Sequence, residues 1–526
     1  MRRRLSWRAT PNQVDTVVQH VTRPYRVVAS TALVAVVLAV VGALMGPQWD
    51  PVPLTDPLTV ESPDTAIGNA PELPTYPVRT SIVTVRLDGT TVQAQISEPV
   101  GRETPAPAVV FVHGAGTGKF TQAFVAQAHA LAASGVVAMV PDKRLDTYST
   151  MHRDYEAMAD DYEASVELLR GRPSVDPERV GVYAESEGAW IAPIMASRDP
   201  QIAFVVLVSA PVVPPREQAA FAVDAYLRNT GVPHGVFRAI PRAVGISIPG
   251  GLEYVDFDVT AFQRRMTQPV LVVYGTGDAS MPVVQGAEQI IRDTAIAGNV
   301  DVTVRYYAGA NHGIRVGGSV SPDFLRDLSG WVLGLPETGS APPRIAGAQP
   351  EQTYVAAPVP EPRWLRDGTV VLGTVIASVG LLVVAGLLVL GARVVELTGR
   401  LTRPSRERAD PRRFASGVAP SLVGLGTGVV LSVLALVVYL VLIARLALDY
   451  ERNDWVVTGG WLVVRALGLA AVAAGVLAVA RIRRARLSGV RAAPGLVRPV
   501  ALWAVGVAAS VLLVVLAYWG VFQLGV

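Results

Sequence analysis

Five long apolar stretches stand out along the chain. Each is almost free of charge over about 20 residues or more, which is the length that a helix needs to cross a bilayer. They cover residues 27–46, 369–392, 417–444, 459–480 and 500–522. The pattern predicts five transmembrane helices, preceded by a short basic N-terminus at residues 1–26.

The region between the first two stretches has a different pattern, that of an α/β domain over residues 79–335. Residues 81–87 and 91–97 alternate around Asp88-Gly89, which predicts a β-hairpin. After it, short apolar runs alternate with helical stretches, as in a mostly parallel sheet with helices on both faces. The predicted strands are 108–112, 136–140, 180–183, 204–209, 270–274 and 302–307, and the predicted helices are 121–134, 151–170, 188–198, 282–297 and 322–333.

Three segments depart from this alternation. Residues 211–266, or thereabouts, contain no sheet strand, and in this fold class such an insertion is expected to form a lid over the ligand site. The Pro-rich segments 47–78 and 336–368 are predicted linkers. At the start of the second linker, Leu335-Pro336-Glu337-Thr338-Gly339 matches the pentapeptide that sortases cleave, but it fits equally a helix end that runs into a linker.

Composition narrows the class of protein. Hydrophobic residues make up 51% of the chain, more than a soluble protein carries. The absence of cysteine excludes disulfides, thiolate zinc sites and a cysteine nucleophile. The six histidines never pair at ligand spacing, and Gly116-Thr117-Gly118-Lys119 lacks the spacing of a phosphate loop, so we expect neither a metal nor a cofactor.

The arginines set the expected orientation. They cluster in the N-terminus and in the loops 393–413 and 481–498, whereas the loop 445–458 balances its arginines with acids. The positive-inside rule then places these arginine-rich segments in the cytoplasm and the α/β domain outside it. Residues 27–46 are thus expected to be a signal anchor in the cell membrane, with a cleaved signal peptide as the alternative. The arginines form no stripe with aromatic residues, so no nucleic-acid partner is expected.

The stretch Gly181 to Trp190 holds the candidate nucleophile, Ser186. It runs from an apolar strand into a helix, which is the context of a nucleophile elbow. Strand and helix nearly touch in such an elbow, so the neighbours two residues away must be small. Ala184 and Gly188 meet that need, although the common pattern has glycine at both positions.

An acid and a histidine follow in the order that this chemistry requires. Asp278 comes in the turn after the predicted strand 270–274, and His312 in the loop after 302–307. A serine needs a base within hydrogen-bond reach, and the base needs a carboxylate that fixes its tautomer. The oxyanion hole is expected from the backbone amides of Glu187, which follows the nucleophile, and Ala115, in the glycine-rich loop His113-Gly114-Ala115-Gly116.

Taken together, these motifs resemble those of the α/β-hydrolase superfamily, and more narrowly of bacterial serine hydrolases related to dienelactone hydrolases and to the catalytic domain of prolyl oligopeptidase. The resemblance covers residues 79–335 and rests on His113 to Gly116, Asp142-Lys143-Arg144, Asp176 to Gly181, Ser186 to Trp190, Gly275 to Asp278 and Asn311-His312-Gly313. It implies a Ser-Asp-His hydrolase in which Asp142-Lys143-Arg144 is structural.

The expected function is that of a membrane-anchored extracytoplasmic serine hydrolase. An ester or thioester is the expected substrate, and the apolar stretch 221–237 in the lid points to an acyl chain from a lipid or the cell envelope. An acyltransferase or a serine peptidase on the same triad is the enzymatic alternative. A ligand-binding domain of a transport or sensor protein is the alternative without catalysis. Glu185 and Glu187 beside the nucleophile either raise the pKa of the histidine or face solvent.

Overall fold

The computed structural model describes residues 12–402, 412–448 and 451–524 of the 526-residue chain. Residues 1–11 of the expected basic N-terminus, and the middle of the arginine-rich loop 393–413, lie outside the described residues. The described chain forms two compact units. The sheet unit comprises residues 50–226 and 248–359, and the helical unit comprises the N-terminal residues up to 49, residues 227–247, and the chain from 360 onward.

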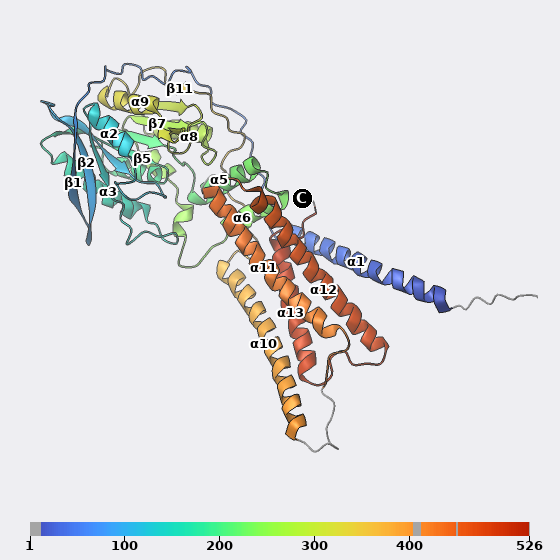
Figure 1. Ribbon diagram of the computed structural model, residues 1–526. Helices are drawn as coiled ribbons and strands as arrows, with labels where there is room; N and C mark the ends of the chain where they lie inside the picture. The colour runs from blue at the N-terminus through green and yellow to red at the C-terminus, as the bar shows by residue number, and fades with distance from the viewer. Residues whose placement is uncertain (1–11, 403–411, 449–450, 525–526) are drawn as a thin grey trace, which may run out of the picture. The chain divides into compact units, whose positions relative to one another are not determined.

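In the described part of the chain, the sheet unit is built on a nine-stranded, mostly parallel sheet (Figure 1). Its spatial order is β1-β2-β4-β3-β5-β6-β7-β8-β11, and all neighbours from β4 to β11 run parallel, while β1 and β2 are antiparallel. The strands are β1 (Val78–Leu87), β2 (Thr90–Pro99), β3 (Ala106–Val112), β4 (Val137–Pro141), β5 (Val175–Glu185), β6 (Val205–Val208), β7 (Val270–Gly275), β8 (Val302–Tyr307) and β11 (Ile345–Gly347). A small separate hairpin joins β9 (Arg315–Val316) and β10 (Ser319–Val320). The predicted hairpin around Asp88-Gly89 is β1-β2, where Leu87 pairs with Thr90.

Two apolar cores cover the two faces of the sheet. Successive residues of a strand point to opposite faces, so Val110 of β3 lies in one core while Val109 and Phe111 lie in the other. The first core also contains α3 (Tyr155–Arg170), α4 (Gly188–Arg198) and α8 (Val283–Ile296). The second contains α2 (Val125–Ala133) and α9 (Pro322–Leu333). The predicted doubly covered α/β sheet is therefore confirmed.

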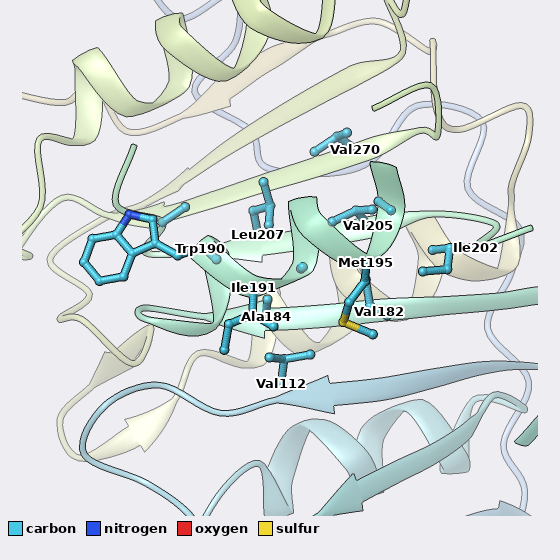
Figure 2. Packing of buried hydrophobic residues seen from close by; sticks show 14 of the residues in the cluster. Val112, Val182, Ala184, Trp190, Ile191, Met195, Ile202, Val205, Leu207 and Val270 are labelled. Carbon is cyan, nitrogen blue, oxygen red and sulfur yellow. The ribbon is translucent and has the colours of Figure 1, made fainter. Parts of the chain in front are cut away.

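Helix α4 packs closely on the centre of the sheet. Its Ile191 and Met195 lie over Val182 of β5 and near Leu207 of β6, as Figure 2 shows. All four side chains are fully buried. Packing of α4 on β5 and β6 fixes the helix that begins two residues after Ser186.

The segments on either side of the domain, expected to be linkers, are ordered against it and against each other. Pro53 bridges to Tyr354, and Ser62 bridges to Ala346 of β11, the strand that extends the sheet beyond β8. The buried guanidinium of Arg305 on β8 adds hydrogen bonds to the carbonyls of Thr65 and Ala66, at 2.7 and 3.2 Å. Composition did not indicate this because the pairing is between distant residues.

The sortase-like pentapeptide is folded. Thr338 is fully buried, and its hydroxyl donates a 2.7 Å hydrogen bond to the carbonyl of Trp331 in α9. The carbonyl of Gly339 accepts a hydrogen bond from the hydroxyl of Thr303 on β8. A protease that needs this peptide in extended form finds it packed against α9 and β8, which favours the interpretation as a helix end.

The insertion between β6 and β7 is helical and belongs to both units. It contains α5 (Pro215–Thr230), η1 (His234–Arg238), α6 (Ala239–Val244), η2 (Glu253–Asp256) and α7 (Thr260–Gln263). Residues 227–247, which include η1 and α6, belong to the helical unit, and the flanks of the insertion belong to the sheet unit. The segment expected to be a lid is therefore in part a component of the helical unit.

The helical unit contains, among the described residues, five helices long and apolar enough to cross a membrane (Figure 1). They are α1 (Asn12–Leu44), α10 (Gly368–Thr402), α11 (Val418–Leu448), α12 (Trp461–Leu487, preceded by the π-turn η4 at Trp455–Gly460) and α13 (Val497–Tyr518). Small residues let these helices approach one another, since a Cβ on Gly428 of α11 would lie 3.0 Å from Cβ of Ala471 in α12. Leu372, Leu387 and Leu390 of α10 are about 60% exposed, a pattern that suits a lipid surrounding.

Arg242 of α6 joins the insertion to the ends of two of these helices. Its side chain is fully buried, and it donates to the carbonyl of Tyr518 at the end of α13. It also donates to the carbonyls of Gly42 and Gly46 at the end of α1, at 3.0 and 3.1 Å. The last carbonyls of a helix lack intrahelical partners, so Arg242 caps both ends at once.

Candidate active site

Ser186 occupies the sharp turn between β5 and α4. Its φ is 56°, in the left-handed region that costs a residue other than glycine about 1–3 kcal/mol, and its amide donates to the carbonyl of Val208 at 3.0 Å. Gly188 is required here, because a Cβ at that position would lie 2.6 Å from the carbonyl oxygen of Val112. Ala184, the departure from the common pattern, is fully buried and pairs with Val112 of β3 and Leu207 of β6. The local geometry is that of the predicted elbow.

Asp278 and His312 are brought together by the ends of β7 and β8. Nδ1 of His312 lies 2.7 Å from Oδ2 of Asp278. The Asp278 side chain is fully buried, whereas His312 is 25% exposed. Ser280 completes the carboxylate shell by donating its amide and its hydroxyl to Oδ1 of Asp278, at 3.0 and 2.6 Å. The hydroxyl of Ser280 was not singled out by the sequence, although its spacing of two residues from Asp278 is typical of such a turn.

The electrostatics of this pair favour an ionised carboxylate. Burial works against charge on Asp278, but the attraction and hydrogen bond of His312, with those of Ser280, lower the pKa of Asp278. Burial likewise opposes a charged His312, yet the attraction and hydrogen bond of Asp278, and a further contribution from Glu185, raise the pKa of His312 above 6.5. Asp278 is therefore favoured as a carboxylate and stabilises a proton on the imidazole of His312, as an orienting acid does for a base.

Ser186 is on the same edge of the sheet, since β5, β7 and β8 are parallel and all three residues follow carboxyl ends. Within the described chain, no hydrogen bond joins the hydroxyl of Ser186 to His312. Hydrogen bonds of this kind are often long in the absence of substrate and close when it binds.

The expected oxyanion donors lie beside the nucleophile. A Cβ on Gly114 would be 3.1 Å from Cβ of Ser186, so the glycine-rich loop approaches the elbow closely. Ala115 follows in that loop, and Glu187 is the N-cap residue that precedes α4. Neither backbone amide donates a hydrogen bond to another described residue, which leaves both free for a ligand. His113 is structural: it is fully buried, its Nε2 lies 2.7 Å from the carbonyl of Pro141, and burial lowers its pKa to about 4.

The two glutamates beside Ser186 have different surroundings. Glu187 is buried and forms ion pairs with Lys143, at 2.8 Å, and with Arg153. Glu185 accepts a 3.3 Å hydrogen bond from Tyr183, and burial raises its pKa. Only Glu185 contributes to the electrostatics of His312, and Glu187 does not face solvent. The sequence missed the partners of Glu187 because Lys143 and Arg153 lie in loops 44 and 34 residues earlier in the chain.

A second residue that the sequence did not single out is Ser209, which directly follows β6. It is fully buried, and its hydroxyl donates a 2.7 Å hydrogen bond to the backbone carbonyl of His312. A polar residue at the end of an otherwise apolar strand was the available signal.

As for metals, the described residues contain no group of three or more His, Cys, Asp or Glu side chains that could hold an ion.

One family of known proteins matches the part of the chain that holds the candidate site. Residues 160–317, which include Ser186, Asp278 and His312, match the family described as BAAT / Acyl-CoA thioester hydrolase C terminal. No curated protein matches the chain.

Solved structures similar to the chain include a putative dienelactone hydrolase from Klebsiella pneumoniae, with 15% identity over 50% of this chain and 99% of that one and a TM-score of 0.36. A dienelactone hydrolase from Anabaena variabilis has 17% identity, coverage of 49% and 97%, and a TM-score of 0.33. A cold-adapted esterase from an Arctic intertidal metagenomic library has 14% identity, coverage of 48% and 93%, and a TM-score of 0.31.

Proposed function

We propose that the α/β-hydrolase domain that this chain carries is a serine esterase or thioesterase, with Ser186 as nucleophile, His312 as general base and Asp278 as the acid that orients the base. One observation carries the proposal. A serine in a strained turn and a buried Asp-His pair 2.7 Å apart converge at the carboxyl ends of three parallel strands. A binding domain has no need of all three groups.

The proposed reaction has two halves. In the first, the oxygen of Ser186 bonds to the carbonyl carbon of the substrate while its proton passes to Nε2 of His312. The amides of Glu187 and Ala115 stabilise the oxyanion, which collapses as the alcohol or thiol leaves with the proton from His312. In the second, water attacks the acyl-serine by the same route and releases the carboxylic acid. Asp278 holds Nδ1–H throughout, so that Nε2 stays the accepting nitrogen.

An acyl ester or thioester is the proposed substrate class. The family match, described as BAAT / Acyl-CoA thioester hydrolase C terminal, spans the three candidate catalytic residues. Five helices long and apolar enough to cross a membrane would keep the enzyme at a lipid surface. These observations support an acyl group borne by a lipid or a cell-envelope component.

The proposed location of the domain is outside the cytoplasm. The support is the distribution of arginine, which is dense in the loops 393–413 and 481–498 and balanced by acids in the loop 445–458. With five spans, the N-terminus then lies in the cytoplasm and the C-terminus outside.

A fluorophosphonate probe applied to membranes tests the proposal. We expect labelling of the native chain and none of Ser186→Ala. The matched control is Ser197→Ala, which removes a hydroxyl of the same helix that bonds to the carbonyl of Ile194 and should label like the native chain. Equal labelling of native and Ser186→Ala, or of neither, would exclude the serine hydrolase. Acyl p-nitrophenyl esters and acyl thioesters of matched chain length then rank the substrates.

A further inference from the structure

The carboxylate of Glu187 is held by two cations and two phenols in the interior of the sheet unit. Oε2 accepts from Nζ of Lys143 at 2.8 Å and from the hydroxyl of Tyr148 at 2.9 Å. Oε1 accepts from Arg153 and, at 3.4 Å, from Tyr155. The side chains of Lys143 and Glu187 are each 1% exposed. Burial of charge is costly, so such a pair calls for a role besides stability.

Lys143 has a second partner, the backbone carbonyl of Gly114, at 2.8 Å. That carbonyl and the amide N–H of Ala115 belong to one planar, trans peptide unit, so they point in opposite directions. By holding the carbonyl on one side, Lys143 fixes the direction of the Ala115 N–H on the other. This is the amide expected to donate to the oxyanion.

The same ammonium group restrains the second donor. Glu187 supplies the other expected oxyanion amide, and its own side chain is the ion-pair partner of Lys143. One buried cation thus connects the loop after β3 to the N-cap of α4. The two segments are more than 70 residues apart in the chain and make up the two halves of the hole.

We propose that Lys143 is a positioning residue that sets the geometry of the oxyanion hole by holding the Gly114–Ala115 peptide plane and the Glu187 side chain at once. The proposal rests on the proposed function, because it gives a role to Lys143 only if an oxyanion forms there. Arg153 is the second cation on Glu187, so the carboxylate stays compensated when Lys143 loses its charge.

The test is Lys143→Met in the full-length chain, measured with the best p-nitrophenyl ester and with a trifluoromethyl ketone of the same acyl chain, which forms a tetrahedral oxyanion. Deleting one oxyanion donor costs about 10²–10³ in kcat, so loosening both is expected to lower kcat by roughly 10- to 100-fold. KM should stay near its native value because substrate binding in the ground state does not use the oxyanion contacts. The inhibition constant of the ketone should rise by about the same factor as kcat falls.

The matched control is Lys119→Met. Lys119 and Lys143 are the only lysines in the sequence, and Lys119 is 54% exposed and paired with Asp142, next to Lys143. It should keep native kcat and native ketone affinity. A role of Lys143 in stability alone would lower the melting temperature and the fraction of labelled enzyme but leave kcat per labelled site unchanged.

Lys143→Gln carries the test if the methionine variant does not fold, since its amide retains a donor for the Gly114 carbonyl without the charge for Glu187. Native kcat and native ketone affinity in either folded variant would overturn the proposal, as would a rise in KM with kcat unchanged. Failure of the proposed function is distinguishable, because the native chain itself would then neither hydrolyse the ester nor react with the fluorophosphonate.

Discussion

The hydroxyl of Ser209 donates a 2.7 Å hydrogen bond to the backbone carbonyl of His312, and so joins the end of β6 to the loop of the candidate base. Ser209 is fully buried, so no water replaces this contact when it is lost.

Removing the hydroxyl of Ser209 should make the position of His312 less fixed. A single hydrogen bond contributes about 1 kcal/mol net, so Ser209→Ala is expected to lower kcat by about fivefold and the free energy of unfolding by about 1 kcal/mol. Steady-state kinetics and thermal unfolding measure the two effects. Ser329→Ala is the control, since it removes an equally buried hydroxyl of α9 that bonds to the carbonyl of Leu325. Equal kcat in both variants would show that Ser209 does not position His312.

The pH–rate profile should report the surroundings of His312. The base must be neutral to accept a proton, and its pKa is raised above 6.5, so kcat/KM should fall as the pH drops through that raised pKa. Asp278→Asn removes the attraction that raises the pKa of His312, so it should move the acidic limb of the profile to lower pH. The same change should lower kcat by roughly 10³- to 10⁴-fold, because the base loses its orienting partner.

Glu185→Gln should change the pKa of His312 in the pH–rate profile without changing the orientation of its imidazole. Glu185 adds to the raised pKa of His312, whereas the hydrogen bond to Nδ1 comes from Asp278. The acidic limb should therefore shift to lower pH by less than in Asp278→Asn, and kcat at its plateau should be nearly retained. An unshifted limb would contradict an electrostatic role for Glu185.

Gly188→Ala should disrupt the elbow. The new Cβ would meet the carbonyl oxygen of Val112 at 2.6 Å, and this oxygen is backbone that cannot move without shifting β3. Overpacking of this kind costs about 1–3 kcal/mol, and labelling by fluorophosphonate should be lost as the turn moves. Gly116→Ala is the comparison, because a Cβ there has nothing within 4 Å. Native labelling of Gly188→Ala would argue that the close approach of strand and helix is dispensable.

The orientation can be tested with single cysteines, since the chain has none of its own. Thr104→Cys, exposed in the sheet unit, should react with a membrane-impermeant maleimide in intact cells. Ser488→Cys, exposed in an arginine-rich loop, should react only after permeabilisation. The reverse pattern would place the domain in the cytoplasm.

Arg242→Ala should weaken the helical unit. The carbonyls of Gly42, Gly46 and Tyr518 would lose a fully buried charged donor, and such hydrogen bonds contribute about 1.5–3 kcal/mol each. We expect a loss of about 3 kcal/mol in total, because the helix ends can relax, read as a lower melting temperature of the full-length protein in detergent. The control is Arg292→Ala, which should change the melting temperature little because the side chain of Arg292 is 65% exposed. Equal melting temperatures of the native chain and Arg242→Ala would show that Arg242 does not stabilise these helix ends.

The sequence was most informative where structure is local. Alternating and continuous apolar runs predicted all the strands from β1 to β8, although β5 begins five residues before the predicted start. The turns after these strands led to the candidates Ser186, Asp278 and His312. Contacts between distant segments leave no such pattern. The hydrogen bond of Lys143 to Gly114 joins residues 29 positions apart in the chain. Strand β11 has three residues in a proline-rich segment, and it forms by pairing with β8 at the edge of the sheet.

The division of the insertion between the two units has a practical consequence. Residues 227–247 lie between β6 and β7, so any fragment that contains the whole sheet also contains them. In such a fragment Val232, Val236 and Ile240, each at most 6% exposed in the full chain, would lose the helical unit and meet water. The sheet unit is therefore not a detachable module. A water-soluble fragment needs this segment redesigned with polar residues, and a sheet unit released from the helical unit by proteolysis would be prone to aggregate.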